Sequence, residues 1–181
     1  NPSSRSLKAA HTILEERDLA DDIAIYVGGL EPIYNIRTLL EAARLLEGWT
    51  LLIIGTGSLI EEVRKADRGS DSVCFVGTVP HETVPGLLAA SDVGVSLVDD
   101  AHTLKVLEYG ASRLPVVQLD GAARERFQES VEYCTADPDQ VADAIRRAKA
   151  RETATLGKIS KGFDMSEIAE SYMEAIDSVG S

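Results

Sequence analysis

The chain has 181 residues, of which 44% are hydrophobic and 5% aromatic, enough for one domain with a sizeable core and short for two. Its 18 lysines and arginines against 30 aspartates and glutamates give a net charge of −12, which argues against nucleic acid or an anionic membrane surface as the main partner. No apolar run approaches the roughly 20 residues of a membrane span, and the N-terminal sequence NPSSRSLKAA lacks the apolar segment of a secretory signal.

The cysteines and histidines do not form a metal-binding pattern. Cys74 and Cys134 lie in the strand-like contexts SVCFVG and VEYCTA, which predict buried free thiols compatible with a reducing cytoplasm. His11, His81 and His102 are too scattered for metal-ligand spacing. We therefore expect no metal.

Short apolar runs alternate with amphipathic stretches along the chain. In chain order they predict a strand at 23–27, a helix at 35–46, a strand at 50–54, a helix from 58 towards 67, a strand at 73–76, a helix at 81–90, a strand at 93–98, a helix after 103, strands at 115–119 and 130–134, and helices at 138–150 and 165–179. Strict alternation with continuously apolar strands predicts a doubly wound, Rossmann-like parallel sheet of about six strands with helices on both faces. The single domain has its core at 23–150 and a connector at 151–164.

Three loops follow strands at the edge where such sheets bind ligands. They contain Gly28-Gly29, Gly55-Thr56-Gly57 and residues 99–103. GTGSLI lacks the third glycine of a dinucleotide fingerprint, no acidic residue ends the next strand, and there is no P-loop motif. A tight turn explains the glycines of the second loop.

The stretch from 99 to 121 combines a helix start with carboxylates. Thr103 is expected to cap the helix, whose first N–H groups attract phosphates. Glu108 repels phosphate but accepts hydrogen bonds from sugar hydroxyls, so the pair indicates a nucleotide or a nucleotide sugar. The spacing leaves Lys105 open as a partner of Glu108 or as a phosphate ligand.

Several blocks in this order resemble the C-terminal half of a retaining glycosyltransferase of the GT-B fold, group 1 or family 4 type. They are YVGGLEP…TLLEAARLL, LLIIGTGSL, VCFVGTVPHETVPGLLAASDVGVSLV and LKVLEYGASRLPVV, within residues 23–148. The resemblance implies one half of a GT-B fold that binds a nucleoside-diphosphate sugar. It also implies transfer of a hexosyl group with retention, no cofactor, and an N-terminal acceptor domain in cis that is absent from this chain. The chain alone is then expected to bind donor without turnover.

The resemblance also assigns roles to single residues. The family carries two acidic residues separated by seven others, a spacing that Asp100 and Glu108 match. Glu108 would hold the ribose hydroxyls, Asp100 would contact the donor sugar where the family usually has Glu, and Val79 would lie near the base. The remaining implied contacts surround the diphosphate: Gly28, Gly29, Ala101, His102, Thr103 and Leu104.

Two positions depart from the family pattern. Gly29 replaces a basic residue that follows the first glycine, and Tyr34 replaces a lysine. Those cations normally neutralise the leaving diphosphate. Lys105, Arg37 or His102 would have to supply the charge, and we favour Lys105 as a catalytic group because it lies on the phosphate-facing helix.

Two alternatives remain open. A nucleotide-sugar 2-epimerase would use the same scaffold, although the block LKVLEYGASRLPVV favours the transferase. A non-catalytic nucleotide-sugar-binding subunit would explain Gly29 and Tyr34. We expect the protein in the cytoplasm, and at the membrane face if the acceptor is lipid-linked or the missing domain binds there.

Overall fold

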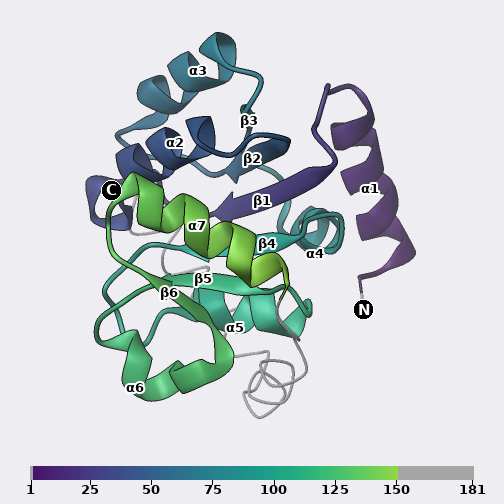
Figure 1. Cartoon of the computed structure of the whole chain (residues 1–181). Helices are drawn as coiled ribbons and strands as arrows, with labels where there is room; N and C mark the ends of the chain where they lie inside the picture. The colour runs from purple at the N-terminus through teal and green to yellow at the C-terminus, as the bar shows by residue number, and fades with distance from the viewer. Residues whose placement is uncertain (1, 151–181) are drawn as a thin grey trace.

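The computed structural model of the chain describes residues 2–150 (Figure 1). The expected connector at 151–164 and helix at 165–179 lie outside the described residues. The described elements, with 3₁₀ helices marked η, are α1 (Ser4–Glu15), β1 (Asp22–Val27), η1 (Pro32–Tyr34), α2 (Ile36–Arg44), β2 (Trp49–Ile54), α3 (Ile60–Gly69), β3 (Val73–Gly77), η2 (His81–Thr83), α4 (Val84–Ala89), β4 (Val93–Ser96), α5 (Leu104–Ala111), β5 (Val116–Leu119), α6 (Ala123–Phe127), η3 (Gln128–Ser130), β6 (Glu132–Cys134) and α7 (Pro138–Lys149).

Within residues 2–150 the strands form one six-stranded parallel sheet in the order β3-β2-β1-β4-β5-β6. This is the doubly wound order, so the predicted Rossmann-like fold is confirmed. The strand order reverses between β1 and β4, which are neighbours in the sheet although β2 and β3 lie between them in the sequence. That reversal places the ends of β1 and β4 at the topological switch point, where open sheets of this kind bind ligands.

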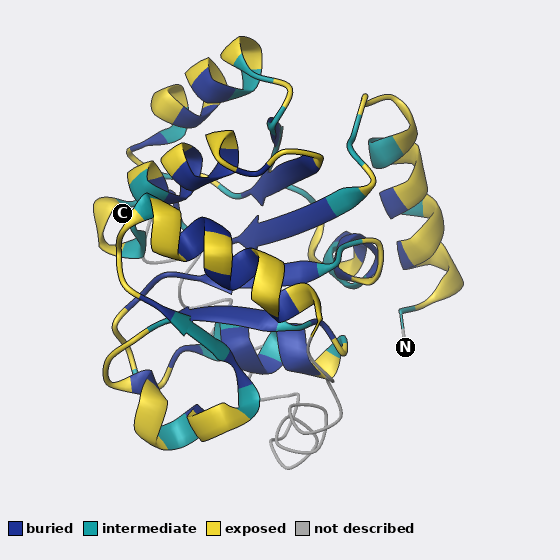
Figure 2. Ribbon diagram, in the orientation of Figure 1, coloured by how far each residue is buried: buried dark blue, intermediate teal, exposed yellow. Residues whose placement is uncertain are grey.

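Helices cover both faces of the sheet, as the apolar strands predict. Figure 1 shows α2 and α7 lying across the near face, where they pack with α3 on side chains such as Ala24, Leu51 and Val95. Helices α1, α4, α5 and α6 bury the alternate strand residues, among them Ile25 and Val116. Because both faces are covered, the central strands are almost entirely buried (Figure 2).

Helix α1 was not predicted from the sequence. Ser6 and Ala10 are buried in it, and the half-buried Ile13 and Leu14 pack on the core, so its inner face does follow helical spacing. It packs closely on α4: a Cβ at Gly86 would lie 2.3 Å from the Ser6 carbonyl oxygen. The Ser6 hydroxyl accepts a hydrogen bond of 2.8 Å from the Gly86 N–H. The five-residue helix α6 was also missed, because it is too short to show a period.

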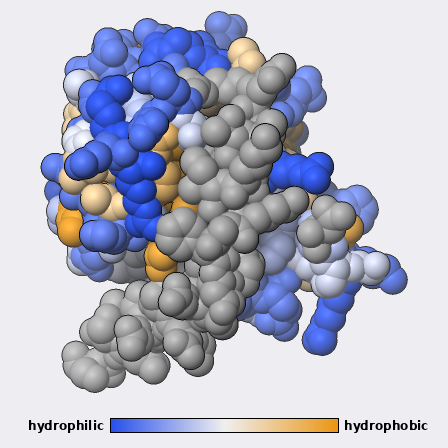
Figure 3. All heavy atoms as spheres, turned by 90° about the horizontal axis from the view of Figure 1, so that it is seen from below, coloured by the Kyte–Doolittle hydropathy of each residue, from blue (hydrophilic) through white to orange (hydrophobic). Residues whose placement is uncertain are grey.

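On the face seen from below, polar residues predominate among the described ones, with a few hydrophobic residues between them (Figure 3). Large hydrophobic side chains that are clearly exposed within residues 2–150 are Leu7, Ile33 and Leu45. Among these same residues, no helix is both long enough and apolar enough to cross a membrane. Cys74 and Cys134 are buried free thiols, as the sequence predicts.

Candidate functional site at the switch point

The strands β1 and β4 part as they approach the switch point. They pair only at Ala24 with Val93 and at Ile25 with Gly94. Beyond these pairs the hydroxyl of Tyr109 lies between the strands: it accepts a hydrogen bond of 3.0 Å from the Val27 N–H and donates one of 3.4 Å to the Val95 carbonyl. A side chain of α5 therefore bridges the two strands at the site.

Tyr109 is fully buried, and burial raises the pKa of its hydroxyl, so it stays protonated. Its ring packs on Gly94, where a Cβ would lie 2.5 Å from Cδ2 of the ring. Asn35 makes a second bridge: it has a φ of 52°, and its side-chain amide donates to the Leu97 carbonyl at 2.8 Å. The sequence did not single out Asn35 or the hydroxyl of Tyr109, because neither contact is visible from spacing along the chain.

The loop between β4 and α5 is ordered by Asp100. Its carboxylate accepts a hydrogen bond of 2.8 Å from the His102 N–H, and its carbonyl accepts one of 3.3 Å from the Thr103 N–H. Two of the N–H groups assigned to the diphosphate by resemblance are thus bonded to Asp100 in this structure. The first turn of α5, from Leu104 onward, is the nearest helix start to which a phosphate could bind.

Thr103 stands at the N-cap position of α5, but the expected side-chain cap is wrong. Its hydroxyl makes no capping hydrogen bond and lies 3.5 Å from the hydroxyl of Ser96 instead. Thr103 is buried, so its side chain is directed to the β4 side of the helix start. Buried Gln118 donates to the Val98 carbonyl at 2.6 Å and supports the same loop.

The following loop also holds the β4–α5 loop in place. Asp99 accepts a hydrogen bond of 2.8 Å from the Ala122 N–H. Arg126, on α6, donates to the Ala101 carbonyl at 3.0 Å. Arg126 was missed at the sequence level because α6 was missed. These contacts fix the backbone around Asp100 from β5 and α6.

The loops after β1 and β2 lie in direct contact. The Leu30 N–H donates to the Thr56 carbonyl at 2.8 Å, and the Gly28 N–H donates to the Ile54 carbonyl at 2.9 Å. A Cβ at Gly55 would lie 1.8 Å from the Gly28 carbonyl oxygen, so only glycine fits there. The glycines of the second loop therefore serve backbone packing, as the tight-turn interpretation requires.

The carboxylate of Glu31 lies at the N-terminal end of α3. It accepts hydrogen bonds from the N–H (2.9 Å) and the hydroxyl of Ser58, and these bonds hold the pKa of Glu31 below its ordinary value. Ser58 therefore does not begin the helix as expected: α3 begins at Ile60 with Leu59 as its N-cap. A phosphate here would meet the Glu31 carboxylate, which leaves the start of α5 as the better anion site.

Lys105 extends from α5 to the end of β1. A Cβ at Gly28 would lie 2.5 Å from Cε and 3.0 Å from Nζ of Lys105. The ammonium lies 4.3 Å from the ring centroid of Tyr34 and 5.8 Å from that of Tyr26. Burial lowers its pKa, while Glu108 and Asp100 act in the opposite direction. The structure thus brings Lys105 to the Gly28 loop.

The other two candidate cations, Arg37 and His102, have different surroundings from Lys105. Arg37 forms a two-point ion pair with Glu62 at 2.6 and 2.7 Å, which occupies its guanidinium. His102 is exposed in the β4–α5 loop. Glu108 is half-buried on α5, one turn after Lys105. Val79, also half-buried, follows β3 and packs on the core. The loop residues, Lys105 and Glu108 therefore gather around the switch point, and Val79 lies two strands away from β1.

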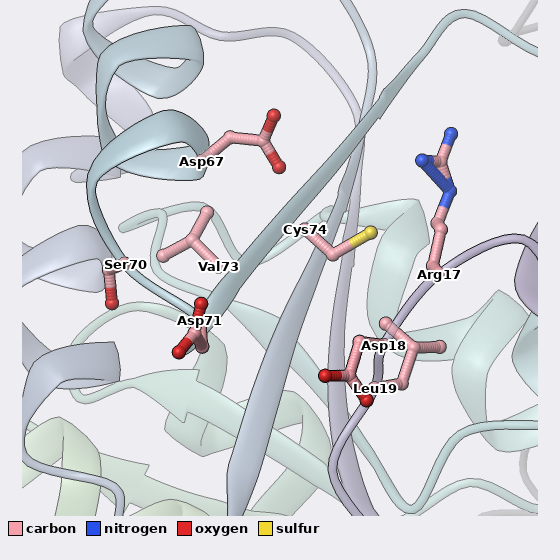
Figure 4. A pocket seen from close by; sticks show the side chains of 8 residues that line it. All are labelled: Arg17, Asp18, Leu19, Asp67, Ser70, Asp71, Val73 and Cys74. Atoms are coloured by element: carbon pink, nitrogen blue, oxygen red, sulfur yellow. The ribbon is translucent and has the colours of Figure 1, made fainter.

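A shallow hollow of about 210 Å³ lies at the opposite edge of the sheet. Figure 4 shows its lining, which includes Asp18, Asp67 and Asp71 around Cys74 and Arg17. Three carboxylates against one guanidinium disfavour a phosphate ligand. Throughout residues 2–150, no group of three or more His, Cys, Asp or Glu side chains is arranged to hold a metal ion.

The strand order and the position of these loops define a Rossmann-like domain, one half of the GT-B architecture. The chain belongs to the family of glycosyl transferases group 1, whose model matches residues 21–150. No curated protein matches the chain by sequence.

Solved structures share this fold. The Anabaena protein HepE in complex with UDP-glucose is 19% identical, with a TM-score of 0.73 over 97% of this chain and 53% of its own. The sucrose-phosphate synthase of Thermosynechococcus elongatus is 24% identical, with a TM-score of 0.70 over 98% of this chain and 49% of its own. The catalytic domain of the cholesterol-α-glucosyltransferase of Helicobacter pylori is 15% identical, with a TM-score of 0.67 over 79% of this chain and 99% of its own. The chain spans about half the length of the first two. At these identities the likeness is one of fold.

Proposed function

We propose that this chain is the donor-binding half of a retaining hexosyltransferase that uses a nucleoside-diphosphate sugar. The observation that carries the proposal is the meeting of Lys105, Glu108 and the start of α5 at the switch point of the sheet. A helix start and an ammonium suit a diphosphate, and a carboxylate beside them suits sugar hydroxyls. The family supports transferase chemistry, and HepE, a protein of the same fold, binds UDP-glucose.

In this proposal the diphosphate lies against the first turn of α5 and the Gly28-Gly29 loop. Lys105 stabilises the charge that develops on the leaving diphosphate, an electrostatic contribution of about 3 kcal/mol for a well-placed donor. Glu108 accepts the ribose hydroxyls. Asp100 contacts the donor sugar, and for this its carboxylate exchanges the His102 N–H for a sugar hydroxyl.

The proposal includes an acceptor-binding domain in the same polypeptide, so this chain alone binds donor without transferring the sugar. The reaction uses no metal or other cofactor, because the helix start and Lys105 supply the stabilising charge. We place the protein in the cytoplasm, where nucleotide sugars are the donors, and at the membrane face when the acceptor is a lipid.

Calorimetric titration of the 181-residue chain with UDP-glucose and a panel of other nucleoside-diphosphate hexoses tests this function. Saturable binding of one donor per chain, with no release of free nucleotide during incubation, is the expected result. Failure of every donor to bind would remove the proposal.

A non-catalytic nucleotide-sugar-binding subunit is the second candidate. It is favoured by Gly29 and Tyr34, which stand where the resemblance implies two cations, although Lys105 reaches the Gly28 loop. Reconstitution with a separately produced acceptor domain distinguishes the two: transfer supports the enzyme, and donor binding without transfer supports the subunit.

A further inference from the structure

The ammonium of Lys105 lies beside two tyrosine rings. Its Nζ is 4.3 Å from the ring centroid of Tyr34 and 5.8 Å from that of Tyr26, distances at which an ammonium is attracted to the face of a ring. Tyr34 belongs to η1, in the loop after β1, and Lys105 belongs to α5. The contact therefore joins the two elements that border the switch point.

The loop after β1 is shaped to receive this lysine. The hydroxyl of Tyr26 donates a hydrogen bond of 2.6 Å to the Gly29 carbonyl, which holds the loop against the strand. Gly28 has no side chain in the path of Lys105, since a Cβ there would lie 2.5 Å from Cε. The ring of Tyr34 closes over the same loop, 3.1 Å from where a Cβ of Gly29 would be.

Two carboxylates also attract the ammonium of Lys105. Glu108 lies three residues after Lys105 on α5, the spacing at which helical ion pairs form, and Asp100 lies in the preceding loop. A lysine side chain is flexible and would otherwise move among these partners. A partner on the far side of the switch point is needed to keep the ammonium at the Gly28 loop.

We propose that Tyr34 is a positioning residue, whose ring holds the ammonium of Lys105 at the Gly28 loop so that it meets the diphosphate of the donor. The inference rests on the proposed function of the chain. It makes one lysine and one tyrosine, contributed from opposite sides of the switch point, the recognition element for the diphosphate.

The test compares affinities for nucleoside diphosphates and monophosphates in the full chain. Calorimetry would use UDP, GDP and ADP with the matching monophosphates, and the variants Tyr34→Leu, Tyr34→Phe, Lys105→Gln and the double variant Tyr34→Leu/Lys105→Gln. Tyr34→Leu is expected to weaken diphosphate binding about three- to thirty-fold, which is the range of an ammonium–ring contact. Tyr34→Phe keeps the ring and is expected to keep the affinity.

The double variant separates positioning from direct contact. If Tyr34 acts through Lys105, Tyr34→Leu costs no further affinity once Lys105 is glutamine. Monophosphate binding should change less than diphosphate binding in both single variants. A ligand-independent reading comes from NMR: ring currents should shift the ε-methylene protons of Lys105 upfield in the unchanged chain and in Tyr34→Phe.

The possible outcomes distinguish failure of the proposed function from failure of the role assigned to Tyr34. If the unchanged chain binds no nucleoside diphosphate, the proposed function fails and the inference fails with it. If it binds and Lys105→Gln or Tyr34→Leu has no effect, the function stands and the inference is overturned. Equal losses from Tyr34→Leu with and without Lys105 would also overturn it, since Tyr34 would then contact the nucleotide directly. Absence of the ring-current shift overturns it even if Tyr34→Leu does not fold.

Discussion

In the proposed function, Glu108 distinguishes the two ends of a nucleotide. A carboxylate accepts hydrogen bonds from hydroxyl groups and repels phosphate oxygens. Glu108 and Lys105 lie one turn apart on α5. The proposal therefore assigns the ribose and the diphosphate to neighbouring residues of opposite charge.

Removing this carboxylate should abolish the recognition of the ribose. Glu108→Ala is expected to weaken binding of a ribonucleoside diphosphate about tenfold to hundredfold, because a hydrogen bond to a charged group is lost. Binding of the 2′,3′-dideoxy analogue should not change. Calorimetry measures both, with Glu41→Ala, an exposed carboxylate on α2, as the matched control. A preference for the ribose form that survives in Glu108→Ala would contradict the assignment.

Gly28 is required by its backbone conformation. Its φ is 152°, and an added Cβ would also displace the flexible end of Lys105, whose Cε would lie 2.5 Å away. Gly28→Ala is therefore expected to lower the free energy of unfolding by about 1–3 kcal/mol, measured by urea denaturation. Gly69→Ala is the control: a Cβ there would have no neighbour within 4 Å, and alanine favours its helix. Equal stability of the two variants would show that a side chain at Gly28 does not strain the backbone.

Helix α5 holds the parting strands together through one hydroxyl. Tyr109 replaces the ladder hydrogen bonds that β1 and β4 lose beyond Ile25 and Gly94. Tyr109→Phe leaves the buried Val27 N–H without its partner and is expected to cost about 1–3 kcal/mol of unfolding free energy. Urea denaturation measures the loss, and Tyr34→Phe, at a half-buried ring, should change stability by less than about 0.5 kcal/mol. A Tyr109→Phe variant as stable as the unchanged chain would show that the bridge is dispensable.

The start of α3 makes stability depend on pH. The pKa of Glu31 is lowered in the folded chain by hydrogen bonds from Ser58, so these bonds stabilise the fold above the ordinary pKa and are lost as the pH falls through the lowered value. Ser58→Ala should therefore reduce the free energy of unfolding at pH 7. The difference from the unchanged chain should shrink in acid, once Glu31 is protonated. Urea denaturation at both pH values measures this, and a difference independent of pH would show that the Glu31 charge does not contribute.

The strands were predictable because each is a short apolar run that ends at glycine or a polar loop, as in β1 before Gly28 and β2 before Gly55. Their parallel order followed from the alternation with helices. Helix α1 was missed although Ala10, Ile13 and Leu14 lie at helical spacing and pack on the core. Its close approach to α4 through Ser6 and Gly86 was not predictable, because a contact between small residues leaves no periodic signal in the sequence.

For the site, the sequence identified the loops but not the contacts within them. The expected helix start at residue 58 and the expected cap at Thr103 were wrong, because the hydroxyls of Ser58 and Thr103 interact with Glu31 and Ser96. The hydrogen bond from Asn35 to the Leu97 carbonyl depends on a left-handed backbone conformation at Asn35, which no local sequence pattern predicts. Competition and long-range contact are properties of the folded chain, and sequence spacing does not report them.

In the whole molecule, carboxylates lie at both edges of the sheet: Asp99 and Asp100 at the switch point, and Asp18, Asp67 and Asp71 around the hollow. The switch-point edge differs because Lys105 and the N-terminal end of α5 lie there together. In a chain whose net charge is −12, local donors of this kind have to attract an anionic ligand. We propose that this edge binds a nucleoside-diphosphate sugar.

The most direct test is NMR mapping of the isotope-labelled chain as UDP-glucose and other nucleoside-diphosphate hexoses are added. If the proposed function is correct, the backbone chemical shifts change saturably at the carboxyl ends of the strands. The changes are then centred on Gly28, Gly29, Glu108 and the loop at 100–104. Shifts gathered instead around the hollow between Asp18 and Cys74, or no saturable shifts with any donor, would contradict it.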